Sequence, residues 1–117
     1  MRREAVIVRL WRARAGTANE RAYADHFRRN VLPQLEAIPG FRGATLLRAA
    51  RGDEVELVVL TRWRSMDAIR AFAGEEVERA VVEPEAAAAL VDYDLAVSHY
   101  EIVEETRHGV DKPPRRG

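Results

Sequence analysis

The stretch Glu54–Gly74, EVELVVLTRWRSMDAIRAFAG, decides the fold of this chain. Its first part is rich in β-branched and other apolar residues and lacks Gly and Pro, which predicts a β-strand over Val55–Trp63. Its second part predicts a helix over Ser65–Ala73, with Ser65 as the N-cap and Gly74 as the C-terminal stop. Because the centre of the strand is apolar on both faces, the strand needs cover on both sides.

Composition limits the class of protein. The chain has 117 residues, with 19 basic and 19 acidic side chains and no cysteine. The length suits one domain, which we place at residues 1–104, and the balance of charge argues against nucleic acid or a membrane as a partner. The absence of cysteine excludes disulfides and thiolate metal sites. The charged N-terminal run resembles neither a signal peptide nor a membrane span, so we expect a cytoplasmic protein.

Upstream of the deciding stretch, the pattern predicts a strand, a helix and a second strand. The first strand covers Glu4–Arg14 and again has apolar residues on both faces. Thr17-Ala-Asn-Glu20 matches a capping box, and apolar residues spaced three and four apart predict a helix that continues to Ile38. Pro33 removes a backbone donor inside this helix and predicts a kink or a restart. A turn then leads into the second strand, Phe41–Ala49.

Downstream, the pattern predicts a helical segment over Glu75–Val82, a short helix over Pro84–Leu90 and a fourth strand over Leu95–Val103. Residues 105–117 are rich in Pro and charge, and we predict that they are disordered. The element order βαββαβ is that of the α+β ferredoxin-like fold, a four-stranded antiparallel sheet with helices on one face.

This architecture leaves one face of the sheet without helices, although the strands are apolar on both faces. A large exposed apolar face marks an association surface. A second copy packed sheet against sheet about a two-fold axis would cover it. The pattern therefore predicts a homodimer.

A set of short motifs runs through residues 5–103. They are Trp11-Arg12, Leu32-Pro33, Ile38-Pro39-Gly40-Phe41, Thr61-Arg62-Trp63 with Ser65, Ala68-Ile69, Phe72-Ala73-Gly74 and His99-Tyr100-Glu101. Together they resemble the antibiotic biosynthesis monooxygenase (ABM) domain family of the dimeric α+β barrel superfamily. The resemblance implies a ferredoxin-like protomer, two sheets that form a barrel in the dimer, and a ligand cavity between sheet and helices. Members of known activity oxidise aromatic polyketides or quinols without metal or flavin, and others degrade haem.

Three positions distinguish this chain from the haem-degrading members that it resembles. Those members carry a catalytic Trp where this chain has Phe72, and an iron-binding His where it has Val81 or Val82. The Asn on their first strand meets Arg9 or a neighbouring apolar residue here. All three departures disfavour haem degradation, and we expect no cofactor.

Two strand residues are the candidate catalytic groups. Trp63, beside the start of a helix, would form a pocket wall and donate a hydrogen bond to a carbonyl or phenolate; alternatively it is a core or interface residue. His99 would remove a phenolic proton, because histidine titrates near neutral pH. Alternatively His99 is structural and pairs across the dimer or with Glu101.

Six further side chains are candidate substrate-binding residues: Arg9, Trp11, Tyr23, His26, Asn30 and Phe72. A buried Arg9 needs an anionic partner, namely Glu56, Glu101 or the carboxylate or enolate of a ligand. The tyrosine, the histidine and the asparagine share one flank of the predicted helix, which lines the cavity mouth or faces solvent. The phenylalanine also suits simple core packing.

The spacing of His, Asp and Glu indicates no metal site. Two classes of function are therefore left open. The first is a cofactor-independent monooxygenase for a small phenol, quinol or polyketide-type aromatic molecule, whose anion itself reduces O₂ in a dry pocket. The second is a non-catalytic dimeric barrel that binds a small hydrophobic molecule. A base and a hydrogen-bond donor that converge on one point of the cavity would favour the enzyme.

Overall fold

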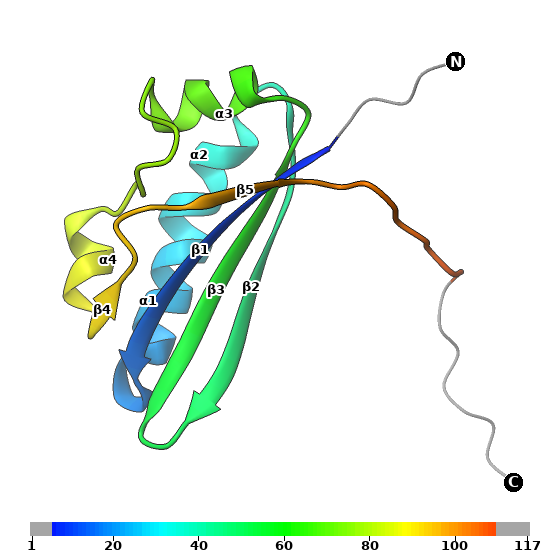
Figure 1. Ribbon diagram of the computed structural model, residues 1–117. Coiled ribbons are helices and arrows are strands. Elements are labelled where there is room, and N and C mark those ends of the chain that lie inside the picture. Colours follow the sequence, from blue (N-terminus) through cyan, green and yellow to red (C-terminus); the bar gives the residue numbers. More distant parts are fainter. Residues whose placement is uncertain (1–5, 110–117) are drawn as a thin grey trace, which may run out of the picture.

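The computed structural model describes residues 6–109 and shows helices packed on one face of an antiparallel sheet (Figure 1). The strands are β1 (Ile7–Gly16), β2 (Phe41–Arg51), β3 (Glu54–Trp63), β4 (Asp92–Tyr93) and β5 (Ser98–Glu101). β3 lies between β2 and β1, and both β4 and β5 pair with the other edge of β1. This arrangement confirms the α+β ferredoxin-like fold predicted for the protomer.

All helical segments lie on the same side of the sheet. They are η1 (Thr17–Asn19), α1 (Glu20–His26), η2 (Phe27–Val31), α2 (Leu32–Glu36), α3 (Met66–Ala73) and α4 (Pro84–Ala88). Alternate residues of β3, from Val55 to Trp63, point towards these helices and are buried. This central strand therefore carries the core, as its apolar sequence predicts.

Of the two features predicted for the long helix, its start differs from the prediction and its restart agrees with it. The predicted capping box at Thr17 is wrong, because a 3₁₀ turn precedes α1 and Asn19 stands at the N-cap without a side-chain hydrogen bond. The predicted restart at Pro33 is confirmed. The π-helical turn η2 widens the helix so that the Leu32 N–H bonds to the Phe27 carbonyl, and Pro33 falls in the first turn of α2, which needs no N–H there.

Helix α3 has both of its predicted ends. The Ser65 Oγ accepts from the Ala68 N–H at 3.1 Å. Gly74 has a φ of 85° and donates its N–H to the Arg70 carbonyl at 2.8 Å. These local signals fix the helix directly after the central strand.

The predicted helix over Glu75–Val82 is wrong. Residues 75–83, the covering loop, contain no helix, because their backbone pairs with the chain ahead of β5. The Ala80 N–H donates to the Leu95 carbonyl at 2.9 Å, and the Val97 N–H donates to the Glu78 carbonyl at 2.8 Å. Long-range backbone pairing has overridden the local helical pattern.

The same pairing shortens the predicted fourth strand. Residues 95–97 leave β1 for the covering loop, so Leu95–Val103 contributes only β5, and β4 pairs separately with β1. After β5 the chain runs away from the sheet (Figure 1). Residues 105–109 are exposed and have neither helix nor strand. Residues 110–117 and Glu4 lie outside the described residues, so disorder of the tail stays a prediction.

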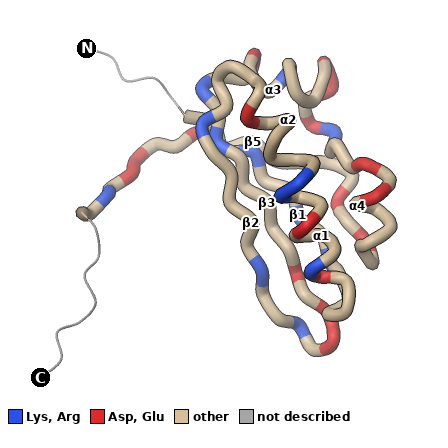
Figure 2. The backbone as a smooth tube through the Cα atoms, turned by 180° about the vertical axis from the view of Figure 1, so that it is seen from behind, with Lys and Arg blue, Asp and Glu red and all other residues tan. Residues whose placement is uncertain are grey.

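The face of the sheet opposite the helices has an apolar patch between charged residues, which include Arg12, Glu56 and Arg62. It carries Val8, Leu10, Leu47, Val58 and Leu60, as the strand register requires. Leu47 is 44 % exposed. Acidic and basic residues are interspersed along the rest of the chain (Figure 2). None of the helices in residues 6–109 is long and apolar enough to cross a membrane.

The turn before β2 offers a test of the packing between β2 and α3. Gly40 has a φ of 95°, and a Cβ placed there would lie 2.7 Å from the Ala68 Cβ. At Gly52, which has a φ of 66°, the same Cβ would meet open space. Gly52→Ala should lower the free energy of unfolding by about 1 kcal/mol for the left-handed backbone alone. Gly40→Ala should cost about 2–4 kcal/mol, because a steric clash adds to that strain. Urea unfolding followed by circular dichroism measures both, and equal losses would contradict the expectation.

Candidate functional site

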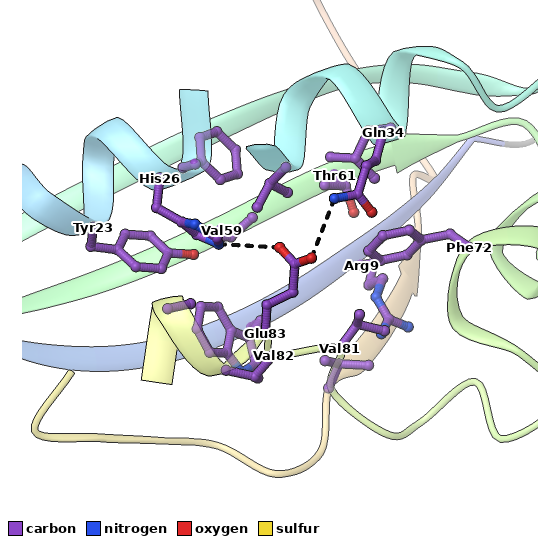
Figure 3. A pocket seen from close by; sticks show the side chains of 16 residues that line it. Arg9, Tyr23, His26, Gln34, Val59, Thr61, Phe72, Val81, Val82 and Glu83 are labelled. Carbon is purple, nitrogen blue, oxygen red and sulfur yellow. Dashed lines mark hydrogen bonds and ion pairs between the residues drawn. The ribbon is translucent and has the colours of Figure 1, made fainter. Parts of the chain in front are cut away.

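A cavity of about 70 Å³ lies between the sheet and the helices, under the covering loop (Figure 3). Strands β1 and β3 form its floor, α1 to α2 form one wall, and α3, α4 and the covering loop form the rest. One water needs roughly 10–15 Å³ of such a cavity, so the cavity has room for roughly five waters. Five water molecules occupy roughly 150 Å³ in the liquid, which is about the volume of a cavity that holds one benzene molecule.

Arg9 places a cation at one end of the cavity. Its side chain projects from β1, is buried, and packs with its guanidinium carbon 5.8 Å from the centre of the Phe72 ring. Nη1 donates to the Val77 carbonyl at 2.6 Å, and Nη2 donates to the Arg79 carbonyl at 3.0 Å. Arg9 therefore ties the covering loop to the sheet.

The expected carboxylate partner of Arg9 is not found among the described residues. Glu56 pairs with Arg51, and Glu101 is exposed; neither reaches the guanidinium. Burial lowers the pKa of Arg9 to about 10, and the charge of Glu78 opposes this shift. The guanidinium thus stays charged at neutral pH while its hydrogen bonds go to neutral acceptors. An anionic ligand group would complete its charge pairing.

His99 lies behind Arg9 rather than in the cavity. The two residues are paired across β1 and β5, and Nε2 of the histidine is 3.1 Å from Nη1 of the arginine. A guanidinium can only donate, so Nε2 is the acceptor and a neutral His99 carries its proton on Nδ1. Desolvation lowers the pKa of His99, the nearby Arg9 charge lowers it further, and Glu78 raises it. His99 therefore positions Arg9.

Trp63 also lies behind the cavity, where it is fully buried. Its ring contacts Phe41 edge-on and stacks on Phe72, with ring centres 5.9 Å apart in the stacked pair. The indole Nε1–H donates to the Thr61 Oγ1 at 2.8 Å. Thr61 lines the cavity, and its own hydroxyl hydrogen has no acceptor among the described residues. The indole thus orients a hydroxyl donor towards the cavity.

Trp63 and His99 share one face of the sheet. The register places Thr61 opposite Arg9, and Arg9 opposite His99, with Trp63 two residues from Thr61. Neither Trp63 nor His99 lines the cavity, so the expectation that both reach it is wrong. Each acts on the cavity through one neighbour.

The other end of the cavity holds a histidine and a carboxylate. His26 comes from α1 and is only 5 % exposed, and Glu83 ends the covering loop. His26 Nε2 and Glu83 Oε1 lie 3.3 Å apart, but their geometry is not that of a hydrogen bond, so both buried atoms lack one. Asn30 lies outside the cavity lining and reaches Nδ1 of His26 with its Nδ2 at 2.9 Å.

Aromatic side chains line the space between these two ends. Trp11, Tyr23 and Phe72 all contribute to the cavity, as the sequence predicts for the first strand, the long helix and the helix after Trp63. The Trp11 indole N–H is occupied by the Asp94 carbonyl at 2.8 Å. Burial raises the pKa of Tyr23, so its phenol stays neutral.

The sequence did not identify Thr61, Glu83 or Gln34 as cavity residues. Thr61 could have been found, because strand alternation puts it on the face of Trp63. Glu83 and Gln34, whose side chains are 3.4 Å apart, meet only through the fold of the covering loop. Residues 6–109 contain no cluster of His, Cys, Asp or Glu that could hold a metal.

Comparison with known proteins shows the family of the sequence. The family model described as antibiotic biosynthesis monooxygenase matches residues 5–84. Among curated proteins, none matches the sequence.

Solved structures share the fold at low sequence identity. A haem-degrading protein from Mycobacterium tuberculosis is 20 % identical, with a TM-score of 0.63; the match covers 91 % of this chain and 100 % of that protein's chain. A monooxygenase from Streptomyces coelicolor, in complex with nanaomycin D, is 20 % identical, with a TM-score of 0.54 and 95 % of each chain covered. SnoaB, a cofactor-independent oxygenase from Streptomyces nogalater, is 21 % identical, with a TM-score of 0.54; the match covers 92 % of this chain and 100 % of the SnoaB chain.

The lowered pKa of His99 predicts how stability changes with pH. The folded state binds fewer protons than the unfolded state near the ordinary histidine pKa of about 6.5. Stability is therefore fully present above that value and is lost as the pH falls through the lower, folded-state pKa. His99→Gln keeps an acceptor for Arg9 and does not titrate, so its melting temperature should fall less on acidification than that of the wild type. His108→Gln, in the exposed terminal segment, is the matched control. Parallel curves for wild type and His99→Gln would contradict the assignment.

Proposed function

Because the chain belongs to the antibiotic biosynthesis monooxygenase family, we propose that it is a cofactor-independent monooxygenase for a small aromatic phenol or quinol. The observation that supports this proposal is the convergence of donors and an acceptor on one cavity. Arg9 and Thr61 offer donors at one end, and Glu83 offers a carboxylate at the other. The aromatic lining between them shields a bound ring from water, which strengthens every charge interaction inside.

The proposed reaction needs no reductant other than the substrate. The ionised phenol transfers an electron to O₂, and the two radicals combine at a ring carbon. One oxygen atom stays on the ring as a carbonyl, and the other leaves as water with the former O–H and C–H hydrogens. The protein has to accept a proton, hold the ring as an anion and exclude bulk water.

The side chains that touch the cavity suit these tasks better than Trp63 and His99, the catalytic candidates that the sequence predicts. Arg9 is a permanent cation beside the lining, and the free Thr61 hydroxyl hydrogen can donate to a developing oxyanion. Trp63 and His99 are assigned to positioning, because each holds one of these two groups. The cavity volume limits the substrate to about one ring unless the covering loop moves.

We also propose that the functional unit is a homodimer built on the open face of the sheet. That face carries five apolar side chains on β1, β2 and β3 and has no helix over it among the described residues. A second copy packed sheet to sheet would bury roughly 2,000 Å² in total, which is enough for a stable dimer.

Sedimentation at micromolar concentration tests this dimer. Leu47→Asp puts a charge on the open face and should convert the protein to a monomer, because a buried unpaired carboxylate is costly. Leu95→Asp is the matched control, since Leu95 is 76 % exposed and lies off that face. A wild-type monomer, or a Leu47→Asp variant that stays dimeric, would refute the proposed interface.

Oxygen uptake with single-ring phenols and quinols tests the enzyme. The chelator-treated wild type should consume O₂ and release the quinone product. Thr61→Val should lower kcat by about 10²–10³, the usual effect of losing one oxyanion donor. Thr17→Val, at an exposed position outside the cavity, should keep the wild-type rate. Trp63→Phe should lower kcat less than Thr61→Val, because it removes only the group that orients the hydroxyl.

Two results would count against the enzyme proposal. The first is no uptake above the uncatalysed rate for any substrate while the protein is folded. The second is tight binding of haem followed by its breakdown, which would place the chain with its haem-degrading structural neighbours.

A further inference from the structure

The end of the cavity formed by His26 and Glu83 contains two buried polar atoms that lack hydrogen bonds. These are Nε2 of the imidazole and Oε1 of the carboxylate, 3.3 Å apart. Leaving a buried donor or acceptor unpaired is costly, so such groups in a folded protein call for a partner that fills them. Both side chains line the cavity, and Figure 3 shows them pointing towards each other across their ion-pair contact.

The neighbours of His26 determine which of its ring nitrogens donates and which accepts. Asn30 Nδ2 lies 2.9 Å from His26 Nδ1 and 3.3 Å from Glu85 Oε1. A carboxylate accepts only, so the glutamate requires the amide NH₂ on this side and fixes the orientation of Asn30. The amide nitrogen donates only and lies closer to Nδ1 of His26 than Glu85 Oε1 does, at 2.9 Å against 3.6 Å, so Nδ1 accepts from Asn30 and Nε2 carries the ring hydrogen.

The pair therefore consists of one donor, Nε2–H, and one acceptor, Oε1, which lie in ion-pair contact at 3.3 Å but without a hydrogen bond. A single group that both accepts and donates at one atom satisfies both, and a hydroxyl is such a group. A carbonyl or ether oxygen would leave Oε1 unpaired, and an anionic oxygen would face the carboxylate. Gln34 contacts the second oxygen, Oε2, at 3.4 Å and so leaves Oε1 facing the cavity.

We infer that Glu83 and His26 bind the neutral hydroxyl group of a one-ring phenolic ligand. Glu83 Oε1 accepts the hydroxyl hydrogen, and His26 Nε2–H donates to the hydroxyl oxygen. The opposite end of the ring points to Arg9 and Thr61, which favour an acceptor such as a carbonyl or nitro oxygen. A further step rests on the proposed function. In that step Glu83 takes the phenolic proton, and the phenolate oxygen keeps its hydrogen bond from His26.

An isosteric pair of probes tests this binding mode on the full chain. 4-Nitrophenol and 4-nitrotoluene differ by a hydroxyl in place of a methyl group, and both carry an acceptor at the far end. Equilibrium dialysis should show that the wild type binds the phenol at least about tenfold more tightly, because the methyl group leaves both buried atoms unpaired. Equal affinities, or tighter binding of the toluene, would overturn the inference without any variant.

The ionisation of the bound probe gives a second readout. At a pH equal to the pKa of free 4-nitrophenol, the probe bound to the wild type should absorb as the neutral phenol, because the Glu83 carboxylate disfavours the anion. In Glu83→Leu, which removes the acceptor, the tenfold preference should be lost. In Glu83→Gln, which keeps an acceptor oxygen but loses the negative charge, the phenolate band should grow. Glu75→Gln, the same change at an exposed site of the same loop, should match the wild type in both. A bound phenolate in the wild type would contradict the inference.

The outcomes separate this inference from the enzyme proposal. Selective binding of the neutral phenol without oxygen uptake would support the hydroxyl site and reject the oxygenase. Oxygen uptake that is unchanged in folded Glu83→Gln would reject Glu83 as the proton acceptor and leave the oxygenase standing.

Discussion

The buried charge of Arg9 is the interaction on which the site depends. A guanidinium taken out of water needs acceptors for its N–H groups, and Arg9 bonds to the Val77 and Arg79 carbonyls and to His99, which leaves part of its five donors for a ligand. The first two belong to the covering loop, so the satisfaction of one charge on β1 also closes the cavity. Because these acceptors are neutral, the nearby charge of Glu78 offsets the positive charge only in part, since burial still lowers the pKa of Arg9. The loop is thus held shut by a group that can still attract an anion.

The cavity has two ends because different parts of the fold build them. Sheet residues provide the cation and the hydroxyl donor, and strands hold such groups in narrow geometry. Helix α1 and the end of the covering loop provide His26 and Glu83. A ring that spans the cavity therefore bridges the sheet and the covering loop. Any movement of the loop would change the distance between acceptor and donors, so binding and loop position are linked.

Local signals predicted most of the fold and about half of the site. Strand alternation placed Arg9 and Trp11 on one face of the first strand, and the Ser65 and Gly74 signals gave the ends of α3. That the helices cover this face, and that Trp63 shares it, came only from the structure. The helix over Glu75–Val82 failed because backbone pairing with residues 95–97, distant in sequence, determined that segment. The sequence of Glu75–Val82 favours a helix only when its pairing with residues 95–97 is left out of account. Glu83 was missed for the same reason: its role depends on a loop whose shape no local periodicity encodes.

The residues that stand out by type in the sequence turn out to support the site from behind. A tryptophan at the end of a strand and a histidine in an apolar run both suggest chemistry, yet Trp63 orients Thr61 and His99 orients Arg9. The reason is physical. A short hydroxyl or a long guanidinium keeps several rotamers unless a rigid neighbour selects one, and planar rings with fixed hydrogen-bonding atoms do this well. The side chains that touch a ligand are then ordinary in type, and the conspicuous ones are those that hold them in place.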